Sequence, residues 1–160
     1  MKSLFGLFIL LLLFFLPRAQ EIKKIKITEL ESYISRSDHP LIINFWATFC
    51  GPCVREIPYF QTVSAKYREE GVELLLVSLD LPNYYPQKIA SFAKENHFQA
   101  NIEWLNETNA DYFCPLVDKN WTGGIPSTLF VNNKTKFRRF FERQLTEPQV
   151  DQNIKEMIAR

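Results

Sequence analysis

The stretch NFWATFCGPCVREIP, residues 44–58, decides the fold, because two cysteines stand just past the end of an apolar run. That run, Leu41 to Ala47, predicts a buried strand. Apolar residues recur at helical spacing from Val54 to Tyr67, which predicts a helix directly after the cysteines. Cys50 and Cys53 in this position could form a structural disulfide, half of a metal site or a working redox pair.

The rest of the chain alternates between helical and strand patterns. VELLLVSL, Val72–Leu79, is apolar almost throughout, as in a central strand covered on both faces. A strand, a helix and a strand in this order form a βαβ unit, whose crossover is right-handed. The other predicted elements are a helix over Thr28–Arg36 that opens with a capping box of Thr28 and Glu31, a helix over Pro86–Asn96, a short strand over 100–105, a hairpin of 127–131 and 136–141 around Asn132 and Asn133, and a last helix capped by Thr146 that runs to Ile158. We therefore expect an α/β fold with a central mixed sheet flanked by helices.

Residues 1–19 have the layout of a secretory signal peptide. Lys2 precedes an apolar block from Leu4 to Leu16, and Ala19 stands at the expected cleavage edge. A bilayer span takes about 20 residues, so an uncleaved membrane anchor is the weaker alternative. We expect residues 20–160 to form one domain. Removal of residues 1–19 leaves 17 basic and 18 acidic residues, a balance that gives no reason to expect nucleic acid as a partner.

The number of cysteines argues against a disulfide-stapled scaffold. Export would place them in an oxidising compartment, but the chain has only three, Cys50, Cys53 and Cys114, and enough apolar residues to fold without bridges. A zinc site would need four ligands, which these cysteines and His97 could supply, but the sequence has no second close pair of ligands. We expect Cys114 to be a small buried hydrophobic residue and Asp80, at the end of the central strand, to cap a loop.

A C-x-x-C pair at the start of a helix places the first sulfur where free backbone N–H groups and the positive end of the helix dipole point. Such surroundings lower a cysteine pKa from about 8.5 to between about 3.5 and 7.5, so we expect Cys50 to be largely a thiolate at neutral pH. We expect Cys53, which lies one turn further along the helix, to be more buried than Cys50. Cys50 is thus predicted to attack a substrate disulfide and Cys53 to resolve the mixed disulfide. Pro52 stiffens the turn, and Gly51 lets a substrate backbone approach closely.

NFWATFCGPC, residues 44–53, resembles the active-site motif of the thioredoxin superfamily. TGGIPSTLFV, residues 122–131, resembles the second landmark of that family, in which the bond before a proline is cis and faces the cysteines. The resemblance implies a thioredoxin-like fold over residues 20–160, with an inserted helix and strand region between the two landmarks. It assigns Ile125 and Pro126 to a substrate-binding ledge. Together with the leader, the chain is most similar to the TlpA-like and ResA-like branch, whose members are exported thiol-disulfide oxidoreductases.

The chain departs from the family pattern close to the cysteines. Asn44 stands where cytosolic thioredoxins have a buried aspartate, and it cannot take up a proton at neutral pH. Glu56 matches the glutamate that the ResA-like branch places near its cysteines, which implies that it tunes the pair and accepts the proton of Cys53; the alternative is a solvated carboxylate on a helix face. Phe49 replaces a tryptophan and keeps a flat apolar lip for a substrate. Trp46 matches the other tryptophan of the family and is expected to pack under the site.

The sequence leaves three functions open. The favoured one is a dithiol reductase of disulfide-bearing exported proteins, kept reduced by a thiol electron donor in the membrane, and cytochrome c maturation is one compatible role. The alternatives are a disulfide-forming oxidase or isomerase on the same fold, and a non-enzymatic assembly chaperone for a metal or a cytochrome. Gly51 and Pro52 between the cysteines resemble the reducing end of the family, which favours the reductase.

The resemblance also sets expectations for the surroundings of the protein. We expect a monomer in the periplasm or a similar extracytoplasmic space of a bacterium. The Cys50–Cys53 disulfide is the expected redox group. No cofactor, metal or nucleic acid is expected to take part.

Overall fold

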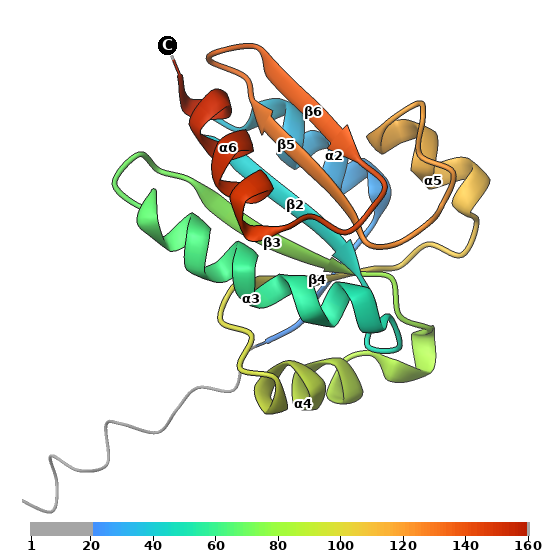
Figure 1. Cartoon of the computed structure of the whole chain (residues 1–160). Helices are drawn as coiled ribbons and strands as arrows, with labels where there is room; N and C mark the ends of the chain where they lie inside the picture. The colour runs from blue at the N-terminus through green and yellow to red at the C-terminus, as the bar shows by residue number, and fades with distance from the viewer. Residues whose placement is uncertain (1–20, 160) are drawn as a thin grey trace, which may run out of the picture.

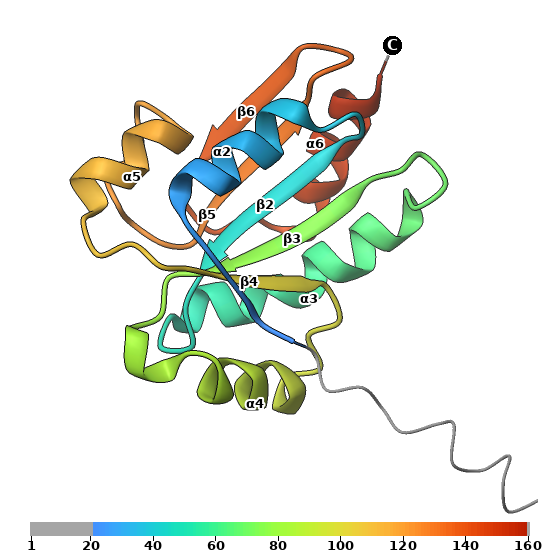
Figure 2. The same ribbon diagram turned by 180° about the vertical axis from the view of Figure 1, so that it is seen from behind.

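Leu41–Trp46 forms a central strand of a six-stranded sheet in the computed structural model, which describes residues 21–159 (Figures 1 and 2). All six residues of this strand are buried, as expected for the apolar run. The strands lie in the order β1-β4-β3-β2-β5-β6. Their bounds are β1 Lys23–Ile25, β2 Leu41–Trp46, β3 Glu73–Ser78, β4 Asn101–Leu105, β5 Ser127–Asn132 and β6 Phe137–Phe141.

The sheet is mixed because β2 has a parallel neighbour on one side and an antiparallel neighbour on the other. β1, β4, β3 and β2 run parallel to one another, whereas β5 is antiparallel to β2 and β6 is antiparallel to β5. Parallel neighbours need a crossover, and the helix after the cysteines supplies it between β2 and β3. The predicted mixed sheet is confirmed.

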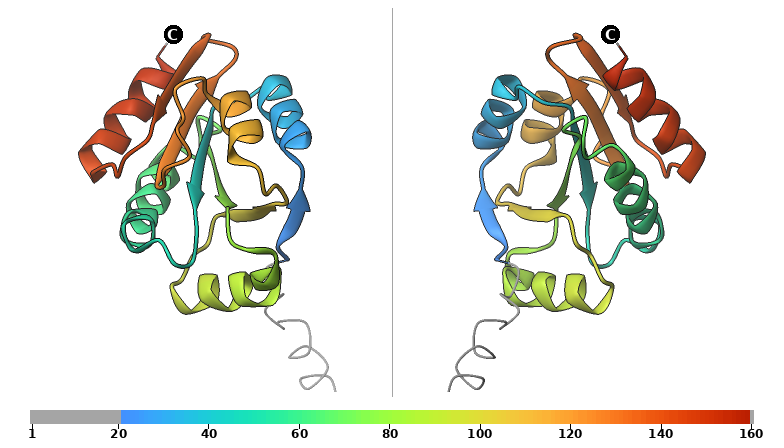
Figure 3. Two further views of the ribbon diagram at one scale, coloured as in Figure 1. Left: turned by 90° about the vertical axis from the view of Figure 1, so that its right-hand side faces the viewer. Right: turned by 90° about the vertical axis from the view of Figure 1, so that its left-hand side faces the viewer.

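Helices cover both faces of the sheet. Figure 3 shows α3 and α6 on one side and α2 and α5 on the other, with α4 below the sheet in that view. The layer under α3, α4 and α6 buries Trp46, Phe60 and Phe130, and the layer under α2 and α5 buries Phe45 and Leu129. The helices are α2 Ile27–Arg36, α3 Gly51–Lys66, α4 Gln87–Glu95, α5 Ala110–Val117 and α6 Glu147–Ile158, and a short 3-10 helix, η2 Pro82–Tyr84, precedes α4.

Alternation along β2 decides which of its residues lie under the cysteine helix. Successive side chains of a strand point to opposite faces. Ile42, Asn44 and Trp46 therefore share the α3 face, whereas Ile43 and Phe45 pack on the α2 face. The polar Asn44 is thereby held in an otherwise apolar layer beneath α3.

The start of α2 differs from the prediction. α2 begins at Ile27, and the Glu29 carboxylate accepts the backbone N–H of Lys26 at 2.7 Å. The predicted capping box of Thr28 with Glu31 is therefore wrong. The helix starts one residue earlier because Glu29 stands three residues after Lys26 and reaches back to its free N–H.

The region between the two landmarks contains α4 and β4, which confirms the inserted helix and strand, and also α5, which no pattern indicated. α5 is eight residues long, contains Pro115 and has no side-chain hydrogen bond at its N-cap residue Asn109. A short helix with an internal proline gives little periodic signal. The hairpin differs as well, because β5 extends to Asn132 and residues 133–136 form the turn.

The predicted secretory signal of residues 1–19, and its alternative as a membrane anchor, lie outside the described residues. Within residues 21–159, none of the helices combines the length and the apolar character needed to cross a bilayer. The secretory signal and the alternative membrane anchor therefore both stay predictions.

Candidate redox site

Three segments of the site leave the same end of the sheet. β2 ends at Trp46, shortly before the cysteines, and the parallel β3 ends beside Trp46, so that the segment with Asp80 leaves in the same direction. β5 runs the opposite way and begins beside Phe45, so that the residues directly before it, including Pro126, reach this end too. The strand register therefore brings the three segments together at the carboxyl end of β2, the edge at which α/β sheets bind ligands.

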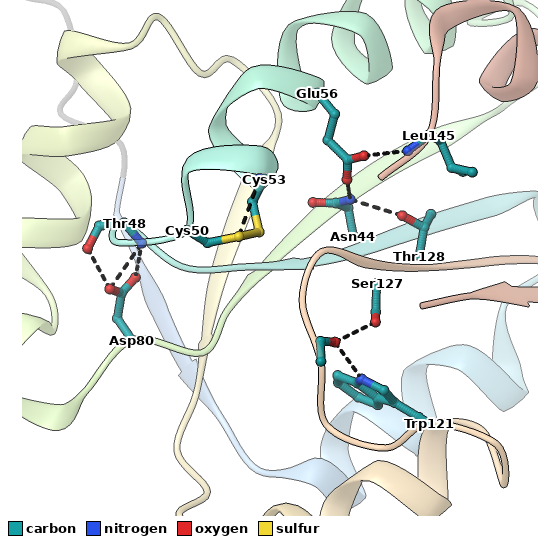
Figure 4. Close-up of a disulfide and its surroundings, with 11 residues drawn as sticks. Asn44, Thr48, Cys50, Cys53, Glu56, Asp80, Trp121, Ser127, Thr128 and Leu145 are labelled. Carbon is teal, nitrogen blue, oxygen red and sulfur yellow. Dashed lines mark hydrogen bonds between the residues drawn. A yellow bond between two sulfur atoms is a disulfide. The ribbon is translucent and has the colours of Figure 1, made fainter. Parts of the chain in front are cut away.

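Cys50 and Cys53 form a disulfide at the N-terminus of α3 (Figure 4). Cys50 is the N-cap residue, and its Sγ accepts the backbone N–H of Cys53 at 3.3 Å. Pro52 lies in the first turn, where its missing N–H costs no helical hydrogen bond. Cys50 is 8% exposed and Cys53 is 0% exposed. Of the two cysteines only Cys50 therefore has exposed surface, and it lies at the positive end of the helix.

The loop before Cys50 is tied to the end of β3 by Asp80. The buried Asp80 carboxylate accepts the Thr48 backbone N–H at 3.1 Å and the Thr48 hydroxyl at 2.6 Å (Figure 4), and it accepts the Ser78 hydroxyl at 2.8 Å. Its backbone carbonyl accepts the Trp104 indole N–H at 2.7 Å. Asp80 thus caps a loop, as expected, and the loop is the one that leads into the cysteines.

Two large apolar side chains are exposed next to the Asp80 tether, that is, the hydrogen bonds between Asp80 and Thr48. Phe49 follows Thr48 and is 65% exposed, and Leu81 follows Asp80 and is 59% exposed. Gly51 lies at the surface as well, and a β-carbon there would meet only the end of a neighbouring arginine side chain, at 3.4 Å. The fold itself therefore does not require glycine at this position, and the surface beside Cys50 carries the exposed side chain of Phe49.

Glu56 lies one turn after Cys53 on the buried face of α3, and none of its surface is exposed. Its Oε1 accepts an N–H of the Asn44 amide and its Oε2 accepts the Leu145 backbone N–H, each at 2.8 Å. Burial raises the pKa of Glu56 to about 7, and the hydrogen bonds from Leu145 and Asn44 oppose the rise. Glu56 is therefore not a solvated carboxylate on a helix face, and it changes protonation near neutral pH.

Trp46 and Asn44 lie beneath the cysteine pair on β2. Trp46 is fully buried, and its ring packs against Phe98 and Phe92 with centroid distances of 5.3 and 6.1 Å. Asn44 is fully buried too, and its Nδ2 donates to Glu56 and, at 3.0 Å, to the hydroxyl of Thr128. One residue thus provides packing and the other connects β2 to α3 and β5.

The loop before β5 forms the other side of the site. The peptide bond between Ile125 and Pro126 is cis, as the resemblance implied. The Gly124 carbonyl accepts the Trp121 indole N–H at 2.9 Å and the Ser127 hydroxyl at 2.7 Å, which holds the loop in place (Figure 4). Ile125 is half-buried and packs against both core layers, whereas Pro126 is buried.

Glu142, just after β6, accepts three hydrogen bonds from this loop, and these contacts form the Glu142 clasp. Its carboxylate accepts the Thr122 backbone N–H at 2.9 Å, the Thr122 hydroxyl at 2.6 Å and the Gly124 backbone N–H at 2.6 Å. Desolvation raises the pKa of Glu142, but the hydrogen bonds outweigh it and hold the pKa below its ordinary value. Gly123 has a φ of 99°, which favours glycine, and a β-carbon at Gly124 would lie 2.7 Å from the Glu142 carboxylate, so a side chain there would displace this carboxylate from the loop.

Glu142, Leu145 and Leu81 are residues of the site that the sequence analysis missed. Glu142 and Leu145 lie 20 and 89 residues away from their partners Thr122 and Glu56. Leu145 contributes only its backbone N–H, which no side-chain pattern reveals. Leu81 does have a signal, because a large apolar residue just past the carboxyl end of a central parallel strand lies where such sheets bind ligands.

Cys114 lies in α5 behind the loop, and its sulfur would be 3.9 Å from a β-carbon at Gly123. It is buried and free, and burial, together with the charges of Glu142 and Asp111, raises the pKa of its thiol to about 11. Cys114 is thus a buried small residue, as expected. Over residues 21–159, no three His, Cys, Asp or Glu side chains are grouped so that they could hold a metal ion.

The chain is similar to several thiol-disulfide oxidoreductases. ResA of Geobacillus kaustophilus is 37% identical over 114 residues, which cover 71% of this chain and 60% of that protein. The structure of StoA from Bacillus subtilis matches with a TM-score of 0.56 and 24% identity, over 76% of this chain and 86% of that one. A secreted Mycobacterium tuberculosis disulfide oxidoreductase, homologous to DsbE of E. coli, matches with a TM-score of 0.57 and 15% identity, over 76% and 84% of the two chains. The structural matches establish the thioredoxin-like fold.

The sequence match is broader than the cysteine motif. The chain spans about 60% of the length of the ResA relatives that match most of it. A model of the AhpC/TSA family matches residues 13–140, a range that contains the disulfide, the tether of Asp80 and the loop of Pro126. The resemblance that rested on two short motifs therefore extends over most of the fold, and the chain belongs to the AhpC/TSA family of thioredoxin-like proteins.

Proposed function

We propose that this protein is an exported thiol-disulfide oxidoreductase that reduces disulfides in other exported proteins. One observation carries the proposal, namely the asymmetry of the cysteine pair. Cys50 is 8% exposed and lies at the N-terminus of a helix, while Cys53 is fully buried and lies one turn from the buried Glu56. This arrangement suits a pair in which one thiol attacks and the other resolves.

The proposed reaction starts from the dithiol form. The Cys50 thiolate attacks a substrate disulfide, the S–S bond of the substrate breaks, and the departing sulfur takes a proton from solvent. Cys53 then gives its proton to Glu56 and attacks the Cys50 sulfur. The mixed disulfide breaks, the second substrate sulfur leaves and is protonated, and the Cys50–Cys53 disulfide forms. Two electrons have passed to the substrate, and Glu56, with a pKa of about 7, is suited to accept the proton of Cys53 near neutral pH.

We assign substrate contact to the open surface around the disulfide. Phe49 and Leu81 offer exposed apolar area on one side. The segment Ile125–Pro126 lies on the other side, and its backbone can pair with an extended substrate chain. Gly51 has no side chain and Pro52 stiffens the turn between the cysteines, so a substrate backbone can come close to the disulfide. This surface fits a polypeptide with an apolar residue near its disulfide.

Two features of the sequence support the proposed direction of electron flow and the proposed location. Gly51 and Pro52 resemble the reducing end of the family. The secretory layout of residues 1–19 supports a periplasmic or equivalent bacterial location, and one protein of the same fold is described as secreted. There, a thiol donor in the membrane would return the disulfide to the dithiol, and a cytochrome c precursor is one compatible client.

Reduction of a model protein disulfide, such as those of insulin, tests the roles of the cysteines. Cys50→Ser should abolish turnover, because no other thiol of the described residues is both reachable and at a helix N-terminus. Cys53→Ser should accumulate a mixed disulfide that mass spectrometry detects. Cys114→Ser is the matched control and should keep full activity. Turnover by the Cys50→Ser protein would remove the proposed mechanism.

The reduction potential of the Cys50–Cys53 pair, measured against glutathione, decides between reductase and oxidase. Thioredoxin-like pairs range from about −270 mV to about −120 mV. A value near the lower limit is expected for a reductase. A value near the upper limit would assign the protein to disulfide formation instead.

A further inference from the structure

One oxygen atom near the disulfide is buried without a hydrogen-bond partner. Among the side chains of residues 21–159, the buried polar atoms with no partner are Asn44 Oδ1 and Trp46 Nε1. An unpaired carbonyl oxygen in the interior destabilises the state that contains it, and such atoms are rare in native proteins. Asn44 Oδ1 therefore lacks a donor in the disulfide form of the protein.

The other contacts of Asn44 fix the direction of this oxygen. Its Nδ2 donates to Glu56 at 2.8 Å and to Thr128 at 3.0 Å, so the amide cannot rotate without losing both hydrogen bonds. Figure 4 shows the Asn44 nitrogen facing Glu56 and Thr128, and the oxygen turned toward the side of the disulfide. Cys53 and Glu56 are three positions apart on α3 and both lie on its buried face, above β2. The free oxygen is thus aimed at the region that the Cys53 sulfur occupies.

Reduction of the disulfide creates a hydrogen-bond donor there. A dithiol reductant breaks the Cys50–Cys53 bond and is itself oxidised to a disulfide; one of its two protons ends on the Cys53 sulfur, and the other is released to solvent because Cys50 is left as the thiolate. In the disulfide form Cys53 has no S–H, whereas in the dithiol form it has one.

We infer that Asn44 is a positioning residue for the resolving thiol, whose Oδ1 accepts the S–H of Cys53 in the dithiol form while its Nδ2 continues to hold Glu56. The inference rests on the proposed function in one respect, namely that the Cys50–Cys53 pair cycles between disulfide and dithiol. One rigid amide then aligns both the group that loses the proton and the carboxylate that receives it. An uncharged side chain does this without placing a second carboxylate beside Glu56.

The inference predicts a change in the redox equilibrium. Because Oδ1 gains its partner only on reduction, Asn44 favours the dithiol. Asn44→Leu, which is similar in size and has no polar atoms, should shift the equilibrium with a reference thiol couple about tenfold toward the disulfide. For a two-electron couple this is a change of about 30 mV to a more negative potential.

Two comparisons separate this effect from the other contacts of Asn44. Thr128→Val removes one acceptor of Nδ2 and leaves Oδ1 unchanged, so its potential should equal that of the wild type. Asn44→Leu compared with the wild type at about pH 5, where Glu56 is protonated in both proteins, should show the same tenfold shift, because the shift does not arise from the charge of Glu56. An unchanged potential in Asn44→Leu, or a shift toward the dithiol, would overturn the inference.

Two further measurements make the result independent of folding defects. Chemical unfolding of Asn44→Leu should show a loss of stability in the dithiol form relative to the disulfide form, whereas a purely structural role would change both forms equally. The infrared S–H band of Cys53, measured in a protein with Cys50→Ser and Cys114→Ser, should lie at lower frequency than in the same protein with Asn44→Leu added. Identical bands would count against the contact. Failure of the proposed reductase would instead appear as a wild-type potential near the oxidising limit or as turnover by Cys50→Ser, whereas the test of Asn44 uses only the difference between variant and wild type.

Discussion

The surroundings of Glu56 differ strongly between the folded and the unfolded chain. Its pKa is 4.5 in its ordinary state and about 7 in the folded protein, since burial favours the neutral acid. Between these pH values the folded protein binds a proton that the unfolded chain has lost. The free energy of unfolding therefore decreases as the pH rises through this range, by about 3 kcal/mol, and the loss is complete above the pKa of the folded state.

Glu56→Gln should remove this part of the pH dependence, because an amide does not titrate. The Gln oxygen can still accept the N–H of Leu145, but its NH2 group cannot accept from Asn44, so stability at acid pH should fall by about 1–2 kcal/mol. Urea unfolding of both proteins in the disulfide form, from acid to neutral pH, measures the two profiles. Glu69→Gln, at an exposed carboxylate after α3, is the control and should keep the wild-type slope. A Glu56→Gln protein that keeps the wild-type slope of stability against pH would contradict the assignment of this slope to Glu56.

At the scale of single elements, the loop of residues 47–49 is held by one carboxylate at the end of the neighbouring strand. Asp80→Ala removes the acceptor of both Thr48 hydrogen bonds, so hydrogen exchange at the Thr48 amide should become about tenfold faster. KM for a protein disulfide should rise more than kcat falls, because Phe49 loses its fixed position. Ser78→Ala is the matched control, since it removes the contact within the β3 end and leaves the tether intact. Unchanged exchange at Thr48 in Asp80→Ala would show that other contacts hold the loop.

The clasp at Glu142 should behave in the same way on the opposite side of the disulfide. Glu142→Ala removes the acceptor for Thr122 and Gly124, and opening of residues 122–124 should become about tenfold more frequent. The folded pKa of Glu142 is lowered, so its contribution is present above the pKa of the unfolded chain and is lost as the pH falls through the folded pKa. Hydrogen exchange at residues 122–124, measured as a function of pH, should therefore give the same opening frequency for wild type and Glu142→Ala at acid pH. Thr122→Val, which loses one of the three bonds, should lie between them; a variant indistinguishable from wild type at neutral pH would refute the clasp.

These contacts also show which parts of the structure could be predicted from the sequence. β2 and α3 were predictable because each buries a continuous face and so repeats its apolar residues at a fixed period. α5, with Pro115 in only eight residues, has no such repeat. The cysteine pair and the cis bond before Pro126 were predictable through motifs. The contacts of Glu142 and Leu145 depend on how distant strands align, and no local pattern contains that information.

At the scale of the whole molecule, the end of the sheet away from the disulfide carries its own charged contact. His39 lies before β2, with Nδ1 3.0 Å from an Asp38 oxygen and Nε2 2.8 Å from a Glu73 oxygen at the start of β3. Because both ring nitrogens face acceptors, the ring makes both hydrogen bonds only as the imidazolium. The bond to Asp38 and then that to Glu73 raise the pKa of His39 above 6.5, against the effect of desolvation.

His39→Gln should flatten the stability profile at higher pH than Glu56→Gln does. The His39 contribution is complete below the unfolded pKa of 6.5 and is lost as the pH rises through the raised folded pKa. Its size should be at most about 1 kcal/mol, because the pair is partly exposed. Urea unfolding on both sides of this range is the measurement, and His97→Asn, which keeps a residue tolerant of the positive φ in that turn, is the control. A slope of stability against pH that persists in His39→Gln would contradict its assignment to His39. Insulin reduction should be unaffected by this substitution.

The hydrogen bond from Leu145 to Glu56 joins residues that lie 89 positions apart. Ribosomes make chains from the amino end, so both cysteines emerge long before the strand and the backbone amide that complete their surroundings. During that interval the Glu56 carboxylate lacks this donor. A nascent chain that stops at residue 140 would carry the cysteine motif and Glu56 but not the backbone amide that holds the carboxylate in place.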